Sequence, residues 1–482
     1  MSAVFSRQPE PAELEPLVPA AQRKETPLPK LQLGILCLVR LAEPIAYTQI
    51  FPYVNRMMEW LRVTDNPSRI GTYSGLVESV FAFAQLLFIF QWAKLSDRVG
   101  RKPVILCGLA GSAVSTLLFG MAGSLPSSVS AGGLAGNVAV IQSMVGEITD
   151  ETNQARAFPI LSLCWNLGCI IGPLIGGTLS DPATRYPEIF GDIQYLKDRP
   201  FFLPCALSSS LTLCSIVLGY FTLTETLPSK VQKQNIADGT ATPNYGAITA
   251  PVPAEPAPDV SMKSLLRDPT IISVVRSYFV LSLNGSSIDV LFVLLAYTAI
   301  SLGGLARTPQ EIGFALSFSG LIAAIMGPIF FPWLTKRIPI KKLYPRLMSF
   351  YPVVFLTLPC LNAIAKAYLV PGTDNEISKR GQAILWTALA VPLFLTASPT
   401  SPSREALGRT FGIGQTIAAI SRGIAPTLSS TLFALTTEHH LLGGWLVWLV
   451  MASIGILGIF TARAVKDGVE ERKKHEMTSG SS

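Results

Sequence analysis

Two ionisable residues of opposite charge stand close together in a stretch that is otherwise apolar. In LVRLAEPIAYTQIFPYVN, Arg40 and Glu43 are three positions apart, so they share one face of a helix, and Tyr47 follows one turn beyond Glu43. A charged group within an apolar span costs about 2.5–3.5 kcal/mol on insertion scales, so it normally faces a cavity or a partner. Two interpretations follow. Either Arg40 and Glu43 only offset each other's burial, or Glu43 is a protonatable or ligand-contacting acid in a central cavity.

Four further polar residues interrupt apolar stretches where they could contact a solute. Asp289 lies deep within a long apolar segment and is the second acid that could carry a proton. Arg422 is a candidate for contact with an anion, or for pairing with an acid of another helix. Asn166 precedes a glycine-rich stretch and can face a cavity. Glu78 stands near the start of its segment, where it is either a solvated rim residue or a group that faces the interior.

The sequence contains no set of residues typical of an enzyme or of a metal site. No nucleophile–base set, phosphate-binding loop or metal-ligand cluster is apparent, and no cofactor is expected. All seven cysteines fall within apolar stretches without a CxxC pair, which favours small buried hydrophobic residues over disulfides. Of the three histidines, His439 and His440 are adjacent, but a structural metal site usually needs four ligands. We therefore expect neither catalysis nor a bound metal.

A dense cluster of charge, WAKLSDRVGRK from Trp92 to Lys102, separates two long apolar stretches. Such a cluster cannot lie in hydrocarbon, so it predicts a tight turn at a membrane surface between two spanning helices. Its basic residues place this surface on the cytoplasmic side. One acid lies among them, and an ion network at a helix junction can hold one conformation and release another. The alternative is that the turn only anchors the topology. The residues of this expected conformational gate are Asp97, Arg98, Arg101 and Lys102.

The overall composition predicts that membrane-spanning helices position these residues. Of the 482 residues, 49% are hydrophobic and only 14% charged, and the mean hydropathy is +0.43, whereas a soluble protein is about one quarter charged. A spanning helix needs about 20 apolar residues. Twelve segments meet this description, near residues 31–54, 71–92, 103–124, 127–147, 157–180, 201–223, 270–300, 310–334, 343–368, 381–400, 408–436 and 441–465. We therefore expect an all-α, multi-pass membrane protein.

The distribution of charge predicts the orientation of the chain and its division into units. Lys and Arg are more numerous in the segments expected on the side of both termini than on the opposite side, so both termini should be cytoplasmic. The net charge of +7 then reflects membrane orientation and requires no nucleic-acid partner. The polar N-terminal segment contains no signal peptide, and a long stretch rich in Pro, Ala and Thr has the composition of a flexible linker. The expected units are a disordered cytoplasmic tail (1–30), a six-helix bundle (31–224), a cytoplasmic linker (225–268), a second six-helix bundle (269–466) and a cytoplasmic tail (467–482).

Glycines recur at regular intervals in two of the expected helices. In CWNLGCIIGPLIGGTLSDP, a glycine stands at every fourth position, which permits close approach of another helix, and a proline beside this stripe bends its helix. A second series, Gly313, Gly320 and Gly327, recurs every seven residues. The turn FPWLTKRIPIKK falls in the second half where WAKLSDRVGRK falls in the first, which indicates two related halves. The first stripe and its neighbours are Gly168, Gly172, Pro173, Gly176 and Gly177.

Three of these stretches together resemble the major facilitator superfamily of transporters. WAKLSDRVGRK resembles the family's turn G-x-L-a-D-R-x-G-R-K, with Ala93 in place of the leading glycine. GCIIGPLIGG is similar to the helix-5 motif G-x-x-x-G-P-x-x-G-G of the proton-antiporting branch. RLAEPIAYTQIFPYVN looks like the zinc-induced-facilitator-like group, whose fungal members often accompany the export of secondary metabolites. The turn matches the family at Leu95, Asp97, Arg98, Gly100, Arg101 and Lys102.

The resemblance implies a monomeric, proton-coupled transporter in which two six-helix bundles rock about a central site. It implies efflux or sequestration of a small organic molecule, such as a secondary metabolite or drug, at the plasma membrane or the vacuolar membrane. Asp97, Arg98 and Arg101 would lock the outward-facing state by contact between the bundles. Glu43 is the first choice for the protonating acid, and Asp289 is the second.

Two features of the family are missing from this sequence. The helix-4 arginine that aids proton release in antiporters should fall near residues 128–131 and is absent, which argues against coupling through the usual residue. The Cys-rich N-terminal segment and the His-bearing loop of the plant zinc-induced facilitators are also absent, which argues against zinc as the substrate. The alternatives are a non-transporting receptor or sensor on the same fold, and a facilitative uniporter.

Overall fold

The structure, a computed structural model, describes residues 26–131, 138–149, 153–227, 229–231, 269–397 and 411–465. Within these ranges the chain is helical, and the only strand-type pairing is a single antiparallel bridge between Leu369 and Ile377. Most of the expected N-terminal tail, most of the expected linker and the expected C-terminal tail lie outside the described residues.

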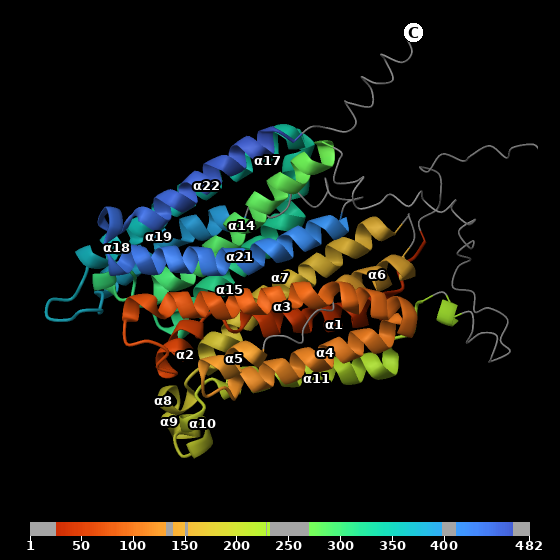
Figure 1. The fold of residues 1–482 in the computed structure, drawn as a ribbon, viewed down its shortest axis with the longest axis horizontal. Helices are drawn as coiled ribbons and strands as arrows, with labels where there is room; N and C mark the ends of the chain where they lie inside the picture. The colour runs from red at the N-terminus through yellow and green to blue at the C-terminus, as the bar shows by residue number, and fades with distance from the viewer. Residues whose placement is uncertain are drawn as a thin grey trace, which may run out of the picture.

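Two groups of helices lie side by side, one from each half of the chain (Figure 1). The N-terminal bundle contains α1 (Lys30–Thr48), α3 (Ile70–Val99), α4 (Arg101–Gly120), α5 (Leu125–Ala131), α6 (Val138–Ile148), α7 (Gln154–Leu179) and α11 (Phe202–Thr222). The C-terminal bundle contains α14 (Pro269–Tyr297), α15 (Pro309–Ile325), α16 (Phe331–Arg337), α17 (Ile340–Met348), α18 (Phe350–Ala367), α19 (Lys379–Ala397), α21 (Phe411–Glu438) and α22 (Leu446–Arg463). Short helices in the connections are α2 (Val54–Trp60), α8 (Pro182–Arg185), α9 (Pro187–Phe190) and α10 (Gln194–Asp198).

Nine helices in the described part of the chain are long and apolar enough to cross a membrane. They coincide with nine of the twelve spans expected from the sequence. The other three expected spans correspond to α5 with α6, to α19 and to α21, each of which borders residues outside the described ranges. The chain is therefore an all-α, multi-pass membrane protein, as predicted.

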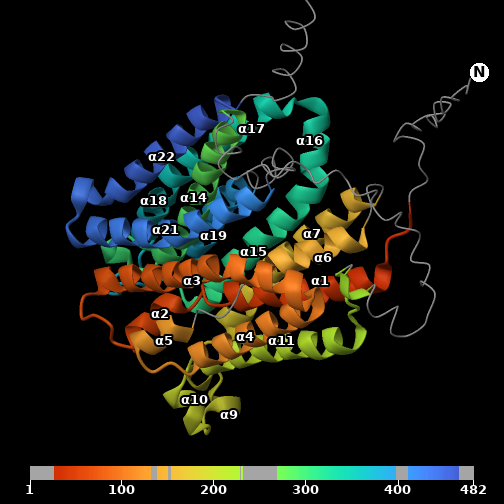
Figure 2. The same ribbon diagram turned by 45° about the vertical axis from the view of Figure 1, so that its right-hand side comes forward.

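The two ends of the molecule need names because the helices run between them. We call the end that carries Gly100 and Glu225 the linker end, and the end that carries Arg69 and Glu438 the far end. In Figure 1 the linker end lies to the right and the far end to the left, where α2 and the short helices α8 to α10 are found. Figure 2 shows the same two bundles from another side, with α9 and α10 projecting from the N-terminal bundle.

Each bundle has a hydrophobic core of its own. In the N-terminal bundle, Leu36 and Ile105 belong to a buried cluster nearer the linker end, and Tyr53 belongs to a second cluster at the far end. In the C-terminal bundle, Leu295 and Phe355 belong to one continuous cluster. Lipid is as apolar as these side chains, so close packing rather than the hydrophobic effect holds such helices together.

The junction between the second and third spans is tighter than the sequence suggests. The charged stretch was expected to form a turn from Trp92 to Lys102, but α3 continues as a helix to Val99 and α4 begins at Arg101. Only Gly100 turns, with φ +121° and ψ 158°, a conformation that side chains on other residues strongly disfavour. The charges of the stretch therefore lie on helix surfaces, where their spacing decides which of them meet.

Candidate functional site

The two bundles meet along two helix pairs, α3 with α21 and α7 with α15. The glycine series Gly313, Gly320 and Gly327, which runs along α15 and into the turn after it, shows how the contact with α7 changes. A Cβ atom on Gly313 would overlap the carbonyl oxygen of Pro173. One on Gly320 would lie 3.0 Å from the carbonyl oxygen of Cys169, whereas one on Gly327 would meet nothing within 4 Å. These helices therefore touch tightly toward the far end and separate toward the linker end.

The contact between α3 and α21 is likewise tight toward the far end and looser toward the linker end. A Cβ atom on Gly75 would lie against Ser430. The hydroxyl oxygen of Ser79 accepts the Thr427 N–H at 3.0 Å and lies 2.8 Å from the Thr427 hydroxyl. Two turns farther along α3, Leu87 is 67% exposed. Both seams are thus closed from the far end to about the middle of the molecule.

Polar contacts between the bundles also join them at the far end itself. Arg69 forms an ion pair with Glu438 of the opposite bundle, with Nη2–Oε1 at 2.8 Å and Nε–Oε2 at 2.9 Å. Asn66 donates a further hydrogen bond to Glu438 at 3.1 Å, and Tyr297 donates one to Glu59. The hydrogen bond from Arg69 holds the pKa of Glu438 below its usual range. This cluster joins the bundles at the far end.

The glycine stripe of α7 packs against α1 within the N-terminal bundle. Cβ atoms on Gly168 and Gly172 would overlap side-chain atoms of Pro44 and Thr48, and the Thr48 hydroxyl donates to the Pro44 carbonyl at 2.7 Å. A Cβ atom on Gly176 would likewise overlap the backbone of α1. Pro173 and Gly177 face the other way, toward α15. One sequence motif therefore holds α1 on one side and the second bundle on the other.

Arg40 and Glu43 form an ion pair, and both side chains are nearly buried, at 10% and 13% exposure. The amide of Gln85 on α3 donates to Glu43 at 3.4 Å, and the Arg40 guanidinium lies 5.1 Å from the centre of the Trp165 ring. The pair thus connects α1 to α3 and α7. A buried pair of this kind is costly to break by removing one partner, because the other charge is then left without compensation.

Tyr47, one turn beyond Glu43, stands in a cluster of aromatic rings. Its ring stacks on Phe81 of α3 with centroids 5.7 Å apart, meets Phe51 edge-on at 5.1 Å and is tilted against Trp165 at 6.5 Å. Aromatic faces of this kind bind apolar and cationic groups. The cluster therefore offers a surface for the apolar part of a solute.

Three charged residues from three helices surround the Tyr47 hydroxyl. Glu78 of α3, Arg422 of α21 and Asp289 of α14 all lie within electrostatic range of it. Glu78 is 8% exposed, whereas Asp289 is exposed. Asp289 also interacts electrostatically with Cys169 of α7, which indicates that it lies on the side of α14 toward the opposite bundle. An exposed acid between helices of both bundles indicates a space between them that solvent can reach.

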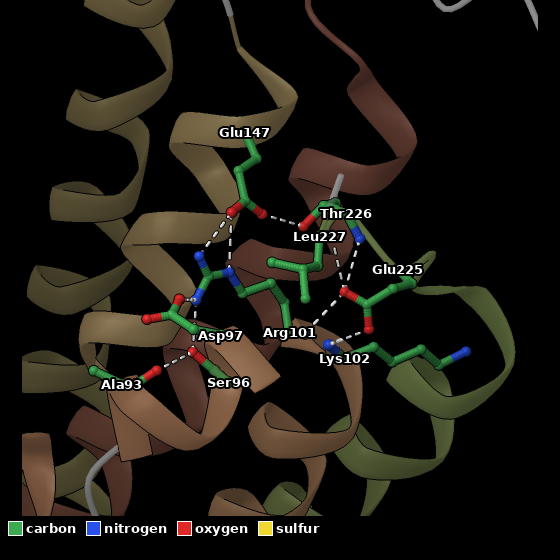
Figure 3. A network of polar contacts seen from close by, with 9 residues as sticks. All are labelled: Ala93, Ser96, Asp97, Arg101, Lys102, Glu147, Glu225, Thr226 and Leu227. Atoms are coloured by element: carbon green, nitrogen blue, oxygen red, sulfur yellow. Dashed lines mark hydrogen bonds and ion pairs between the residues drawn. The ribbon is translucent and has the colours of Figure 1, made fainter. Parts of the chain in front are cut away.

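The basic turn forms a compact network within the N-terminal bundle (Figure 3). Arg101 pairs with Asp97 at 2.6 Å and, from another helix, with Glu147 at 2.8 Å. The Lys102 ammonium lies 5.6 Å from the centre of the Tyr220 ring. Arg98 is exposed and has no ion-pair partner among the described residues. None of the contacts that the structure gives these residues reaches the C-terminal bundle.

The first residues of the expected linker belong to this network. Both carboxylate oxygens of Glu225 accept backbone N–H groups of the turn, from Arg101 at 2.8 Å and from Lys102 at 3.2 Å (Figure 3). The Thr226 hydroxyl donates to Glu147 at 2.6 Å. An anion at the start of a helix satisfies N–H groups that have no partner within the helix. Residues 225 and 226 are therefore fixed to the turn rather than part of a free linker.

The structure brings Arg40, Glu43, Tyr47, Asp289 and Arg422 to one region between the bundles. Asn166 is partly buried on α7, next to Trp165 in the chain, and it forms no hydrogen bond with another residue of the described ranges.

Sequence reasoning left open the place of Glu78 and did not name Gln85 or Glu225. Glu78 could have been recognised as an acid within a span. For Gln85 and Glu225 the sequence carries no signal, because their partners lie 42 and 124 residues away along the chain.

Comparison with known proteins shows clear similarity over most of the chain. Residues 66–426 match the family model described as the Major Facilitator Superfamily. The chain is 37% identical to "Major facilitator-type transporter psiT2" of Psilocybe cyanescens, over 92% of each chain. It is 29% identical to "Efflux pump azaK" of Aspergillus niger, over 94% of this chain and 92% of that protein.

Solved structures show the same arrangement of helices. A bacterial homologue of the human lysosomal transporter Spinster, in an inward-facing and unoccupied conformation, aligns with a TM-score of 0.57. The alignment covers 90% of this chain and 94% of that one at 15% identity, so it speaks for the fold alone.

Proposed function

Because the chain belongs to the Major Facilitator Superfamily, we propose that it moves a small organic molecule out of the cytoplasm by alternating access, in exchange for protons. Members of this family carry small molecules across membranes. The name of the Aspergillus niger relative, an efflux pump, supports the outward direction. The similarity to fungal transporters supports a secondary metabolite or a drug as the cargo.

One observation carries this proposal. The ionisable and aromatic residues from both bundles gather at the depth where the two seams part. Arg40, Glu43 and Tyr47 come from the first bundle, and Asp289 and Arg422 from the second. In alternating access, a site at this depth would open to the linker end when the bundles part there, and to the far end if the bundles rocked the other way. Polar residues that served only to stabilise the fold would not need to lie together at the depth where the two seams part.

The orientation is part of the proposal. We place the linker end and both termini in the cytoplasm, because basic residues favour that side. The structure then corresponds to an inward-facing state, with the ion pair between Arg69 and Glu438 closing the exit. We assign the protein to the plasma membrane or the vacuolar membrane, where such an orientation gives export or sequestration. Epitope tags at the two termini, probed in sealed membrane vesicles, test the orientation.

The basic turn acts as the gate at the linker end. Asp97, Arg98, Arg101 and Lys102 hold the outward-facing state when the linker end closes. Arg101 already has acidic partners in its own bundle. Asp97 and Arg98 are exposed, so they can contact the second bundle when it approaches. The charges of this turn then shift the equilibrium between the inward-facing and the outward-facing state, in addition to stabilising the fold.

Proton coupling requires an acid that is reached from both sides in turn. Glu43 is the first candidate, with Arg40 as the cation that compensates it, and Asp289 is the second. Protonation of Glu43 would remove its ion pair with Arg40, and Arg40 could then pair with another anion. Substitution Glu43→Gln should abolish transport driven by a pH gradient while the protein is still produced and folded.

The test uses the purified protein in proteoliposomes with an imposed pH gradient and a panel of cationic, neutral and anionic fluorescent dyes. Accumulation of at least one dye against its gradient, lost when an ionophore collapses the pH gradient, is the expected result. Flux that ignores the pH gradient would indicate a uniporter, and no flux of any dye would favour a receptor or sensor. Full activity of Glu43→Gln would remove the assignment of Glu43.

A further inference from the structure

Two carboxyl groups from opposite bundles lie within electrostatic range of each other, and neither forms an ion pair with a described residue. Glu78 of α3 and Asp289 of α14 interact electrostatically, and both lie within range of the Tyr47 hydroxyl. The structure gives neither of them a hydrogen bond or an ion pair among the described residues. By contrast, the third acid of this region, Glu43, is paired with Arg40. Glu78 is only 8% exposed, so water does not replace the missing partner fully.

The packing of α3 on α14 supports this placement independently. A Cβ atom on Gly71 would lie 2.7 Å from a methyl carbon of Leu294, so these two positions are level with each other. The helices run in opposite directions. Glu78 lies seven residues from Gly71 and Asp289 lies five residues from Leu294, both toward the linker end. At about 1.5 Å per residue the two acids differ in depth by only about 3 Å.

The surrounding groups supply little positive charge to this pair. Arg422 is one nearby cation, and it interacts with the same Tyr47 hydroxyl. A second cation, Arg40, lies near Cys169 but is paired with Glu43, so when both acids are ionised one negative charge is left uncompensated. The other groups that interact with Asp289, which are Cys169 of α7 and Tyr351 of α18, supply no positive charge. Two like charges that lie close together repel each other unless a cation or a proton lies between them.

We propose that Glu78 and Asp289 bind the positively charged group of the transported molecule, which makes the substrate class an organic cation with an aromatic or apolar body. This inference rests on the proposed transport function and names its substrate. The Tyr47 hydroxyl lies within electrostatic range of both acids, and its ring packs with Phe81 and Phe51, so these rings receive the apolar body. Because one acid belongs to each bundle, the bound cation also bridges the bundles. Release then becomes possible when the bundles move and the two acids separate.

Binding of radiolabelled tetraphenylphosphonium to the full-length protein in detergent, by equilibrium dialysis, tests this site. The probe has a fixed positive charge and an aromatic body, and tetraphenylborate is an anion of nearly the same shape. We expect the wild-type protein to bind the cation and not the anion. Glu78→Gln and Asp289→Asn should each weaken binding of the cation at least about tenfold, because each removes one attractive charge at short range. Binding that is equal in both variants and the wild type would overturn the proposal, as would equal binding of both probes.

A matched control separates loss of the site from loss of the fold. Glu188→Gln removes one negative charge from an exposed position on α9 and should leave binding unchanged. Glu78→Asp keeps the charge and should recover part of the binding that Glu78→Gln loses. Thermal unfolding of each variant shows whether it is folded. If both Glu78 variants are folded and bind equally weakly, the charge is not what binds the probe.

The binding assay uses no pH gradient, so its failure can be distinguished from failure of the proposed transport. Charge-selective binding that depends on both acids, without any flux in proteoliposomes, supports this site and removes proton-coupled export. Dye flux driven by a pH gradient, together with equal binding of the cationic and the anionic probe, would support export and contradict the proposed cation site.

Discussion

Substitution of Gly177 by alanine should push the two bundles apart at the far end. An ideal Cβ atom on Gly177 lies 2.7 Å from the carbonyl oxygen of Pro309 and 3.1 Å from the Cα atom of Gly313, both on α15. Ordinary contact begins near 3.4 Å, so α7 and α15 must separate by several tenths of an ångström. Backbone atoms on both sides cannot rotate away as a side chain could. The strain therefore falls on the contact between the bundles.

The size of the effect follows from the cost of overpacking. Extra methyl groups in a well-packed contact cost about 1–3 kcal/mol. The cost applies only to the state in which the far end is closed, because the contact is absent when that end opens. Since about 1.4 kcal/mol changes an equilibrium constant tenfold, the ratio of closed to open molecules should decrease by a factor of between about 5 and about 100. Gly177→Ala should thus populate the state that opens at the far end.

Distance measurement between paired spin labels at Asp65 and His439 provides the assay. Both residues are exposed at the far end, and they belong to opposite bundles. In Gly177→Ala the distribution should shift toward longer distances than in the unsubstituted labelled protein. The neighbouring substitution Gly176→Ala is a matched control, because its Cβ would overlap Gln49 of the same bundle.

Gly176→Ala should lower thermal stability while leaving the distance distribution unchanged. Gly327→Ala is a second control, because its Cβ would meet nothing within 4 Å and should change neither quantity. A shift of the label distance in Gly176→Ala but not in Gly177→Ala would refute the assignment of these contacts.

Two further predictions concern charged groups at opposite ends of the molecule. The hydrogen bond from Arg69 lowers the pKa of Glu438, so this ion pair should favour far-end closure fully above the ordinary value of 4.5 and lose that effect as pH falls through the lowered value. The label distance should therefore lengthen on acidification in the wild type, and Glu438→Gln should show the longer distance already at neutral pH. At the linker end, Glu225→Gln should destabilise the turn by about 1–2 kcal/mol, because it removes the charge that accepts N–H groups of Arg101 and Lys102. Thermal unfolding of Glu225→Gln measures this loss. The variant Thr226→Val, which loses only the hydrogen bond to Glu147, is the comparison. An unchanged unfolding temperature in Glu225→Gln would contradict the prediction.

Much of the fold could be predicted because lipid imposes local rules. A helix must satisfy its own backbone hydrogen bonds in hydrocarbon, so a long apolar segment is enough to predict a span. Nine of the predicted spans coincide with helices of the required length and hydropathy. The ion pair of Arg40 with Glu43 was also predictable, because a spacing of three residues places both on one helix face.

The site was less predictable, because it is made by contacts between distant segments. Glu78 looked like a possible rim residue, and its burial depends on α21 lying against α3. The region 225–268 looked like a free linker from its composition. Glu225 is nevertheless fixed, because the turn at Gly100 leaves backbone N–H groups at its side that need an acceptor.

The sequence by itself determined that this chain crosses a membrane many times, which segments form most of the spans, and which side chains are too costly to face lipid. It did so because burial in hydrocarbon acts on each residue separately. Only the tertiary structure decided that Glu78 and Asp289 lie together between the bundles, and that the α7 glycines hold α1 on one side and α15 on the other. Those facts depend on how helices from the two halves pack, and helix packing in lipid is set by shape complementarity between segments hundreds of residues apart.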